Sequence, residues 1–413
     1  MAQNENGHTR IEWQSLGGWR GGTVTALAFS PHFAIDKIAL AGTLAGLFLS
    51  TNGGASWQRS SRGLDDPQIT TLTTATTTNG LLALAATQIG QLYRAAWSST
   101  PATIDWQPLD SWAGLGVIQA LAVSPAYTED HTLFTATNEG TYRSQDDGAT
   151  WESSTFGLMD LDILCLACAP DFADSELLWA GSAEGGLYRS RNGARSWRDS
   201  GGGLPDSAMI GLLVSPHYPD DQTLYVATET DGIYYSTDGS ATWRPFATAL
   251  AGLCVNAMAC DAEAQQWLVA TTDGLFLSSD HGETWQKRGN QQEANLELPL
   301  LAVAVDKGCA LTGTLLDGIV RSVDDGATWA PANQGLVAHA APFSQLTTDN
   351  ELFALDIDGL LARYADDANQ WLPWNHPFGD AAVTAIAATT VSAKPLIVAT
   401  ETELFVQADA GKT

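Results

Sequence analysis

The sequence is poor in positive charge and contains no long apolar run. Its 413 residues include 19 Lys and Arg against 47 Asp and Glu, which gives a formal net charge of −28. A surface this acidic repels phosphate backbones and anionic membranes. No stretch approaches the apolar length that a membrane-spanning helix needs. We therefore expect no nucleic acid and no membrane as partner, whereas basic proteins and cations are favoured.

Cysteine and histidine are too sparse and too irregular for a disulfide framework or a metal site. There are five Cys, of which Cys165 and Cys168 form a CxxC inside the strand-like run DILCLACAP. Residues three apart on a strand point to opposite faces, which favours two buried structural thiols. The seven His lack metal-ligand spacing, and no glycine loop for phosphate is present. We expect no metal and no cofactor.

The first residues, MAQNENGHTR, are polar and contain no apolar segment of the kind found in secretory signals. They predict a disordered tail over residues 1–9 and a cytoplasmic protein, although a secreted protein whose signal had been removed would look the same. The whole chain is 45% hydrophobic, which is ample for a large core. We expect a monomer.

Glycine and tryptophan, in contrast, recur at regular distances. There are 39 Gly and 15 Trp, and one Trp recurs at spacings of 49, 45, 46, 46, 42, 44 and 42 residues from Trp57 to Trp371. Trp13 lies 44 residues before Trp57. Self-similarity at such a period indicates a repeat architecture. The recurring positions are Trp13, Trp57, Trp106, Trp151, Trp197, Trp243, Trp285, Trp329 and Trp371, which define nine units.

Each unit reads as four short strands. The first is small and apolar, as in VTALAFSP (24–31), and the second follows a polar loop, as in HTLFTAT (131–137). A tight turn that ends in Gly leads to a third strand such as GTYRS (140–144), and another polar loop leads to the Trp strand. Strands this short, with turns this regular, predict four-stranded antiparallel blades around an axis.

The loop before the Trp carries its own motif, Ser-x-Asp-x-Gly-x-Thr-Trp. The motif is complete at 144–151, 278–285 and 322–329, nearly complete at 50–57, 190–197 and 236–243, and degenerate in units two and eight. This is the Asp box, or BNR repeat, and nearly the whole chain resembles the sialidase-like β-propellers that carry it. Asp or Asn bonds nearby amides, Gly permits the turn and Trp packs on the blade, so the motif is turn chemistry. The residues expected in this structural role are Asn52, Asp146, Asn192, Asp238, Asp280, Asp324 and Asp409, with Trp13, Trp57, Trp151, Trp197, Trp243, Trp285 and Trp329.

The two ends of the chain share one copy of the motif. The sequence ends on QADAGKT (407–413), which lacks the Trp that should follow, and residues 10–16 supply Trp13 in a strand-like run. A closed propeller must join its last blade to its first. We therefore predict a single all-β domain over residues 10–413, a closed β-propeller in which the N-terminal strand completes the last blade. Nine blades are favoured, and eight is the alternative.

The resemblance implies a fold but no sialidase activity. Catalytic sialidases need an arginine triad that converges on the axis and open with an Arg-Ile-Pro motif that this sequence lacks. Xyloglucanases with Asp boxes use two propellers. Glycosidase chemistry needs a pair of carboxylates, and the sequence alone does not indicate which two of its 47 acidic residues would form one. We therefore expect no enzyme. Five Arg occupy one slot in the third strand of different blades and so predict a ring rather than a triad: Arg94, Arg143, Arg189, Arg321 and Arg363.

The remaining candidate site is the face where the turns between second and third strands meet the connectors between blades. The acids could be hairpin chemistry or a docking surface for a basic partner. The connector Trp residues could plug blade junctions, as Leu does elsewhere, or be exposed anchors. The candidate binding residues are Trp19, Arg20, Trp112, Trp374 and His376 in the connectors, and Glu139, Asp231, Asp273, Asp317 and Asp358 in the turns.

These patterns favour a non-enzymatic interaction propeller that binds a protein or peptide through its acidic loop face and channel mouth, and the negative charge favours a basic partner. Photosystem II assembly factors and sortilin-type propellers also resemble this repeat and bind polypeptides, although such assembly factors carry a basic patch that this acidic chain lacks. One alternative is a carbohydrate-binding or glycan-hydrolysing Asp-box propeller. Another is a structural module whose partner domain is encoded elsewhere, because a fold does not fix a function.

Overall fold

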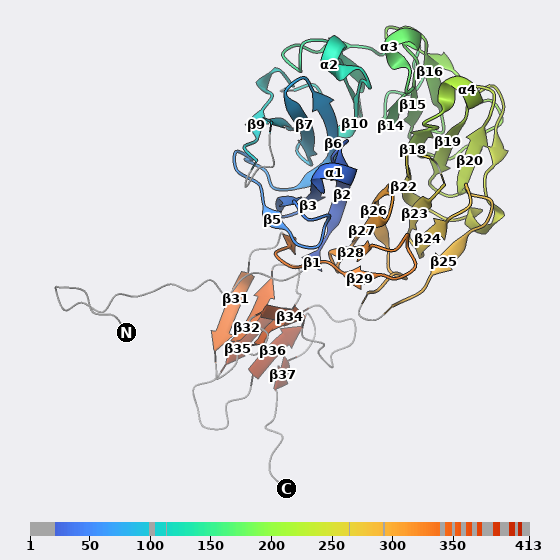
Figure 1. The fold of residues 1–413 in the computed structure, drawn as a ribbon. Helices are drawn as coiled ribbons and strands as arrows, with labels where there is room; N and C mark the ends of the chain where they lie inside the picture. The colour runs from blue at the N-terminus through green and yellow to red at the C-terminus, as the bar shows by residue number, and fades with distance from the viewer. Residues whose placement is uncertain are drawn as a thin grey trace. The chain divides into compact units, whose positions relative to one another are not determined.

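The computed structural model describes residues 21–98, 104–112, 114–263, 265–291 and 294–338, together with strands between residues 343 and 406. The chain divides into two compact units, Gly21–Ala340 and a second made of Met1–Arg20 with Ala341–Thr413. The first unit is a ring of antiparallel sheets (Figure 1). Among the described residues, no helix has the length and hydropathy needed to span a membrane.

Seven four-stranded blades make up the ring, and in each the strands follow one another in chain order. The first strands are β2 (Val24–Phe29), β6 (Ile69–Thr77), β10 (Ile118–Val123), β14 (Ile163–Cys168), β18 (Met209–Val214), β22 (Val255–Cys260) and β26 (Leu300–Asp306). The second strands are β3 (Ala39–Thr43), β7 (Gly80–Thr87), β11 (Leu133–Thr137), β15 (Leu178–Ser182), β19 (Leu224–Thr228), β23 (Trp267–Thr271) and β27 (Cys309–Thr314).

The outer half of each blade is shorter. The third strands are β4 (Gly46–Ser50), β8 (Leu92–Trp97), β12 (Gly140–Ser144), β16 (Leu187–Ser190), β20 (Ile233–Ser236), β24 (Gly274–Ser278) and β28 (Ile319–Ser322). The fourth strands are β5 (Gln58–Arg59), β9 (Gln107–Pro108), β13 (Glu152–Ser153), β17 (Arg198–Asp199), β21 (Arg244–Pro245), β25 (Gln286–Arg288) and β29 (Ala330–Pro331). Each fourth strand pairs only with the third strand of its own blade, after the Asp-box loop.

A one-turn helix follows the first strand in four blades, and each begins at a buried aromatic residue. In three of them the Ser that ends the strand donates to the Asp that ends the helix, as Ser30 Oγ does to Asp36 Oδ2 at 2.6 Å. Blade 2 has a direct hairpin between β6 and β7 instead. The helices are α1 (Phe33–Asp36), α2 (Tyr127–Asp130), α3 (Phe172–Ser175) and α4 (Tyr218–Asp221), with 3₁₀ turns η1 (Asp110–Trp112) and η2 (Thr248–Leu250) between blades.

The ring closes between blade 7 and blade 1. First strands of neighbouring blades contact each other all around the ring, and β26 contacts β2 in the same way. A buried cluster joins Val24 and Phe48 of blade 1 to Leu311 and Ile319 of blade 7. Beside it, β1 (Gly21–Gly22) pairs in parallel with β30 (Val337–Ala338). All seven junctions therefore lie within one continuous stretch of the chain.

The prediction of nine blades, with eight as the alternative and the N-terminal strand completing the last blade, is wrong. The predicted all-β propeller of four-stranded antiparallel blades is present, but it has seven blades. Repeat spacing counts the units in a chain, whereas ring closure depends on which two blades pack together. The joined motif that suggested nine, Trp13 with residues 407–413, lies outside the described residues.

Repeats eight and nine belong to the second unit. Repeat eight forms a four-stranded sheet and repeat nine a three-stranded one, and the two sheets contact each other through their first strands. The strands are β31 (Phe343–Thr348), β32 (Leu352–Asp356), β33 (Leu361–Ala365), β34 (Gln370–Pro373), β35 (Val383–Ala388), β36 (Leu396–Thr400) and β37 (Leu404–Val406).

Candidate functional site

The Asp-box loops are held by hydrogen bonds inside each loop. Ser144 Oγ donates to Asp146 Oδ1 at 2.8 Å, and Asp146 accepts from the amide and the hydroxyl of Thr150 at 2.8 and 2.6 Å. The boxes at 236–243, 278–285 and 322–329 repeat these bonds. Where Asn replaces Asp, the amide group donates instead, as Asn52 Nδ2 does to Ser56 Oγ. The Asp or Asn of each described box thus stabilises its own turn.

The same hydrogen bonds keep the box carboxyls ionised. The hydroxyl and amide of Thr150 hold the pKa of Asp146 below its usual value. The corresponding Thr hydroxyls lower the pKa of Asp238 and Asp324, and they lower that of Asp280 to about 2. Carboxylates that are fully ionised and already bonded are poor proton donors at neutral pH. The bonding of these loops is therefore structural rather than catalytic in character.

Tryptophan side chains at the box position link four of the seven blades to the blade before them. Trp197 Nε1 donates to Ser154 O at 2.6 Å, and Trp243 Nε1 donates to Ser200 O at 2.9 Å. Trp106 makes the equivalent bond even though its box is degenerate. In blades 6 and 7 the indole N–H instead bonds to a carbonyl of its own loop. The same junction geometry thus recurs in four of the seven blades, where the indole N–H bonds to the preceding blade.

Arginines of the third strands reach the box loop of the following blade. Arg189 Nη1 donates to Gly239 O at 2.6 Å, and Arg321 Nε donates to Gly53 O at the same distance. Arg94 makes a longer bond to the carbonyl of Asp147, at 3.3 Å. Arg143 packs beside the equivalent loop, and the side chain of Arg363 lies outside the described residues. The described members are thus distributed around the ring, as their common slot predicted. Three of them bond to the following blade, which the sequence did not predict.

The other face of the ring is built from the hairpins between second and third strands and the connectors between blades. Antiparallel strands place these two kinds of loop at the same end of a blade. Contacts between them are direct: Val117 N donates to Asn138 Oδ1 at 3.0 Å, and Glu184 N donates to Asp160 Oδ2 at 2.9 Å. We call this surface the hairpin face; it comprises the hairpins at 44–45, 88–91, 138–139, 183–186, 229–232, 272–273 and 315–318 and the connectors that follow β5, β9, β13, β17, β21 and β25.

The acids predicted on the hairpin face are exposed there wherever the structure describes them. Glu139, Asp231, Asp273 and Asp317 all lie on its hairpins. Neighbouring segments desolvate the carboxyl of Asp317 and raise its pKa, although the residue as a whole stays exposed. The other candidates predicted for this face, Asp358, Trp19, Arg20, Trp374 and His376, lie outside the described residues.

Trp112 lies in a blade junction and is not an exposed anchor. Its side chain is 1% exposed and ends the 3₁₀ turn η1 between blades 2 and 3. Its indole stands edge-on to the aromatic rings of Trp151 and Tyr142, and the ring centroids lie 5.0 and 5.4 Å from that of Trp112. Trp112 thus plugs the junction, which was the first of its two interpretations, and is not the exposed binding residue of the second. A ligand on the surface cannot reach it in this conformation.

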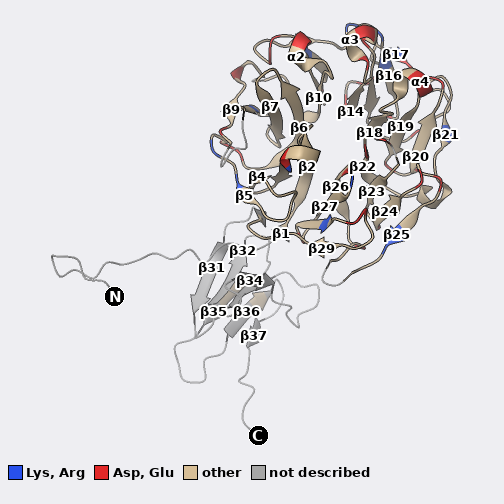
Figure 2. Ribbon diagram, in the orientation of Figure 1, with Lys and Arg blue, Asp and Glu red and all other residues tan. Residues whose placement is uncertain are grey.

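Negative charge does not distinguish the hairpin face from the opposite one. Figure 2 shows Asp and Glu on α2, α3 and α4, which lie on the helix face, the surface formed by the first inter-strand loops and the Asp boxes. Glu129, Asp174 and Asp220 are exposed on these helices. The charge of the chain is therefore spread over both faces, and acids alone do not mark a site.

Exposed apolar side chains do distinguish the hairpin face. Of nine large exposed hydrophobic residues in the described part of the chain, only Ile35 and Val323 lie on the helix face. Phe156 and Met159 are 79% and 88% exposed. The others on the hairpin face are Ile89, Val117, Leu161, Leu315 and Leu316. None of them was predicted from the sequence, because they follow no period and carry no charge.

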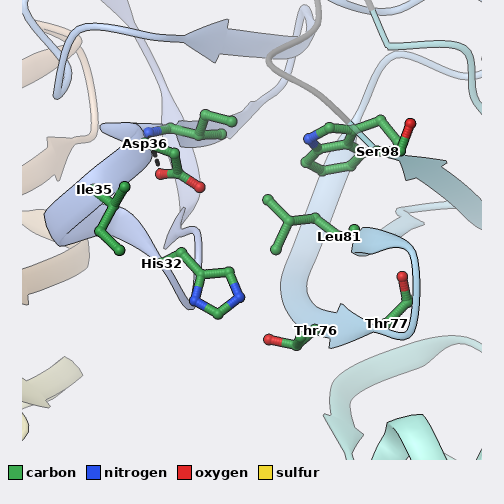
Figure 3. Close-up of a pocket in the computed structure, with 10 residues that line it drawn as sticks. His32, Ile35, Asp36, Thr76, Thr77, Leu81 and Ser98 are labelled. Carbon is green, nitrogen blue, oxygen red and sulfur yellow. Dashed lines mark hydrogen bonds between the residues drawn. The ribbon is translucent and has the colours of Figure 1, made fainter.

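A cavity of about 460 Å³ opens on the helix face between blades 1 and 2 (Figure 3). His32 and Ile35 border it on the side of α1, and Thr76 and Leu81 border it on the side of β6 and β7. On the blade 2 side it is bordered by the β6–β7 hairpin, at the place where four other blades have a helix. The carboxylate of Asp36 in its wall is already bound to Ser30 and to the backbone. Its lining includes Ser98, the last described residue before a gap in the described chain, so we do not treat the cavity as the site.

The CxxC pair is divided between two blade interfaces. Cys165 and Cys168 both lie on β14, but Cys165 packs in the cluster between blades 4 and 5 and Cys168 against the cluster between blades 3 and 4. Their opposite directions follow from the three-residue spacing on a strand, as predicted. Burial raises the pKa of each thiol to about 12. Among the described residues, no group of three or more His, Cys, Asp or Glu is placed to hold a metal ion.

No protein-family model and no curated protein matches the sequence. Solved structures match the fold. The GH74 xyloglucanase from Xanthomonas campestris aligns with 97% of this chain and 74% of its own, at 17% identity and a TM-score of 0.66. The GH74 enzyme of Niastella koreensis aligns with 96% of this chain and 66% of its own, at 16% identity and a TM-score of 0.70.

A structure of YCF48 bound to a D1 peptide matches as well. It aligns with 74% of this chain and 95% of its own, at 16% identity and a TM-score of 0.55. Identities this low establish the fold alone. The ring is therefore a seven-bladed β-propeller of the Asp-box type, similar in architecture both to glycoside hydrolases and to a protein seen with a peptide.

Proposed function

We propose that the propeller is a non-enzymatic binding module that holds a polypeptide on its hairpin face. The observation that carries this proposal is the gathering of seven of the nine exposed large hydrophobic residues on that face. Soluble proteins rarely expose apolar side chains together unless the surface meets another molecule. Aromatic residues and Met are also enriched at protein interfaces, whereas a glycan or a metal would need convergent polar groups.

The lack of catalysis in this proposal is supported by how the polar groups are used. The described box carboxylates bond to their own loops, and the described third-strand arginines bond to or pack against neighbouring blades. Groups engaged in this way contribute to stability and are not free to act on a substrate. YCF48 supports the choice of partner, since it shows that a propeller of similar fold can hold a peptide.

A glycan-processing propeller is the second candidate, and the likeness to two GH74 enzymes favours it. Its test is the release of reducing sugar from xyloglucan by the purified chain. Release above that of a heat-denatured sample would overturn the non-enzymatic proposal, whatever the outcome for peptides.

The experiment for the leading proposal is selection of short random peptides on the immobilised full chain, followed by hydrogen–deuterium exchange. We expect enriched peptides that slow amide exchange in the connector at 154–162 and in the hairpin at 138–139, while the Asp-box loop at 144–151 is unchanged. Failure to enrich any peptide over bare support would contradict the proposal. Protection confined to the box loops would place binding on the helix face and would also contradict the proposal.

A further inference from the structure

We propose that one part of the hairpin face, over blades 2 to 4, docks a polypeptide segment whose apolar side chains stand next to lysine or arginine. This inference rests on the proposed function, namely that a polypeptide binds the hairpin face, and adds the place and the chemistry of the partner. The surface is called the apolar strip and consists of Ile89, Val117, Phe156, Met159 and Leu161. Their side chains are 66%, 36%, 79%, 88% and 45% exposed.

The strip spans two blade junctions, with the exposed hairpin at 138–139 between its two halves. Gly90 packs on the backbone of Gly116 and Val117, which places the neighbouring Ile89 beside Val117. Val117 N in turn bonds to Asn138, at the tip of the blade 3 hairpin. On the far side of that hairpin, the side chain of Leu161 lies against Gly140. The connector at 154–162 then carries Phe156 and Met159 outward, so apolar groups follow one path over the face.

The backbone beneath the most exposed residues is held from both sides. Phe156 O accepts from Trp197 N at 2.8 Å, and the amide of Asp160 donates to the hydroxyl of Tyr188 at 3.1 Å. The carboxylate of Asp160 accepts from the amides of Asp162 and Glu184 at 3.0 and 2.9 Å. A surface that is ordered before binding loses less entropy when a partner arrives. The connector therefore presents Phe156 and Met159 from a fixed base.

The fold itself does not require apolar residues at these positions. Arg62 and Gln334 stand where Phe156 stands in other blades, and their carbonyls accept the same bond from the next Trp amide, at 2.9 and 2.8 Å. Asp65 stands where Met159 stands and is exposed. Since the junction forms equally well with polar residues, the apolar ones in this connector are an addition to the architecture. An addition that costs solubility is explained by a contact with another molecule.

The charges around the strip select a basic partner. Glu139 and Glu184 are exposed beside it. Their accessible carboxylates can accept hydrogen bonds from an ammonium or guanidinium group. A second copy of this chain would instead bring the same acids together, which disfavours self-association. Apolar side chains flanked by Lys or Arg match both properties of the surface.

The test uses the full chain and a fluorescein-labelled synthetic peptide of Leu-Lys-Ala repeats, with anisotropy as the readout. Two matched peptides replace Lys by Glu or Leu by Ser. We expect both replacements to weaken binding by about tenfold or more, as loss of an anchor or of a charge complement does. Joint Phe156→Ser and Met159→Ser substitution should weaken the Leu-Lys-Ala peptide equally. Ile35→Ser, at a site 86% exposed on the helix face, is the matched control and should leave the affinity unchanged.

A second experiment tests the role of charge with the double substitution Glu139→Gln and Glu184→Gln. Glu129→Gln on α2 is the control. The pair should lower the affinity several-fold and flatten its dependence on salt, whereas the control should not. Equal binding of the Lys and Glu peptides, or no loss with the strip substitutions, overturns the inference. Absence of binding to the Leu-Lys-Ala peptide also overturns it.

Failure of the inference and failure of the proposed function can be told apart. Peptides that are selected on the hairpin face but keep their affinity for the Phe156 and Met159 variant overturn the strip and leave the function intact. If selection enriches no peptide, both fall. Sedimentation of the full chain tests self-association. If the chain forms concentration-dependent dimers that disappear in the Phe156 and Met159 variant, the strip binds a second copy of the chain, and the inference is overturned.

Discussion

Trp57 Nε1 donates a hydrogen bond to the carbonyl oxygen of Ala332 at 2.9 Å, across 275 residues of sequence. Trp197 makes the same bond to Ser154, which lies three residues after the Trp of the preceding blade. Ala332 likewise lies three residues after Trp329. The junction between blades 7 and 1 is therefore built like those between blades 1 and 2, 3 and 4, and 4 and 5. The ring closes by repeating one contact, without a strand shared between distant ends of the chain.

The first prediction follows from this closure. Residues 21–340 expressed alone should fold with one cooperative thermal transition, because all seven junctions lie inside them. Near-ultraviolet circular dichroism should show the signal of ordered Trp side chains. The control is a fragment that ends before β26; it lacks the partners of Trp57 and should be unfolded or aggregated. If residues 21–340 behaved like that control, closure by blade 7 would be contradicted.

The second prediction concerns the arginines between blades. Arg189→Met keeps much of the apolar stem but removes the charged guanidinium that donates to Gly239 O at 2.6 Å. The free energy of unfolding should fall by about 1–2 kcal/mol, measured by urea titration. Arg191→Met is the matched control, since Arg191 is exposed in the neighbouring loop, and should change stability by less than about 0.5 kcal/mol. Equal effects of the two substitutions would show that the bond between blades contributes nothing.

Blade architecture could be read from the sequence because it depends on local chemistry. Second strands end at a tight turn with Gly, most third strands end at an Asp box, and the Trp period repeats the same four-strand unit. Blade number could not be read, because the partner of Trp57 is chosen by packing among units that look alike. Trp112 was ambiguous for a similar reason, since a plug and an anchor have the same composition. Phe156 and Met159 become visible only when the connectors are compared position by position with residues such as Arg62.

The third prediction is a dependence of stability on acid. The folded-state pKa values of Asp146, Asp238, Asp280 and Asp324 are depressed by hydrogen bonds from Thr. A depressed folded pKa contributes stability that is fully present above the unfolded value of about 3.9 and is lost as pH falls through the folded value. Urea midpoints should therefore fall between about pH 4 and pH 2.

Replacement of all four by Asn provides the comparison, because Asn already occupies the boxes at 52 and 192 and donates to a hydroxyl there. An amide takes up no proton in this range, so the variant should lose less stability on acidification than the natural chain does. Parallel pH profiles for the two proteins would contradict the role assigned to the box carboxylates.

The fourth prediction separates a buried plug from a surface anchor. Trp112→Ala removes a side chain that is 1% exposed and packs edge-on against Trp151, so it should lower the free energy of unfolding by about 3–5 kcal/mol. Trp112→Leu should recover part of that loss, because Leu336 fills a junction between other blades and is fully buried. Phe156→Ala, at a site 79% exposed, should change stability by less than about 0.5 kcal/mol while it weakens peptide binding. Urea titration and anisotropy on the same three variants make the measurement. A Trp112→Ala variant of normal stability and reduced peptide binding would instead mean that the indole turns outward to meet the ligand, and the junction would then have to open when the partner binds.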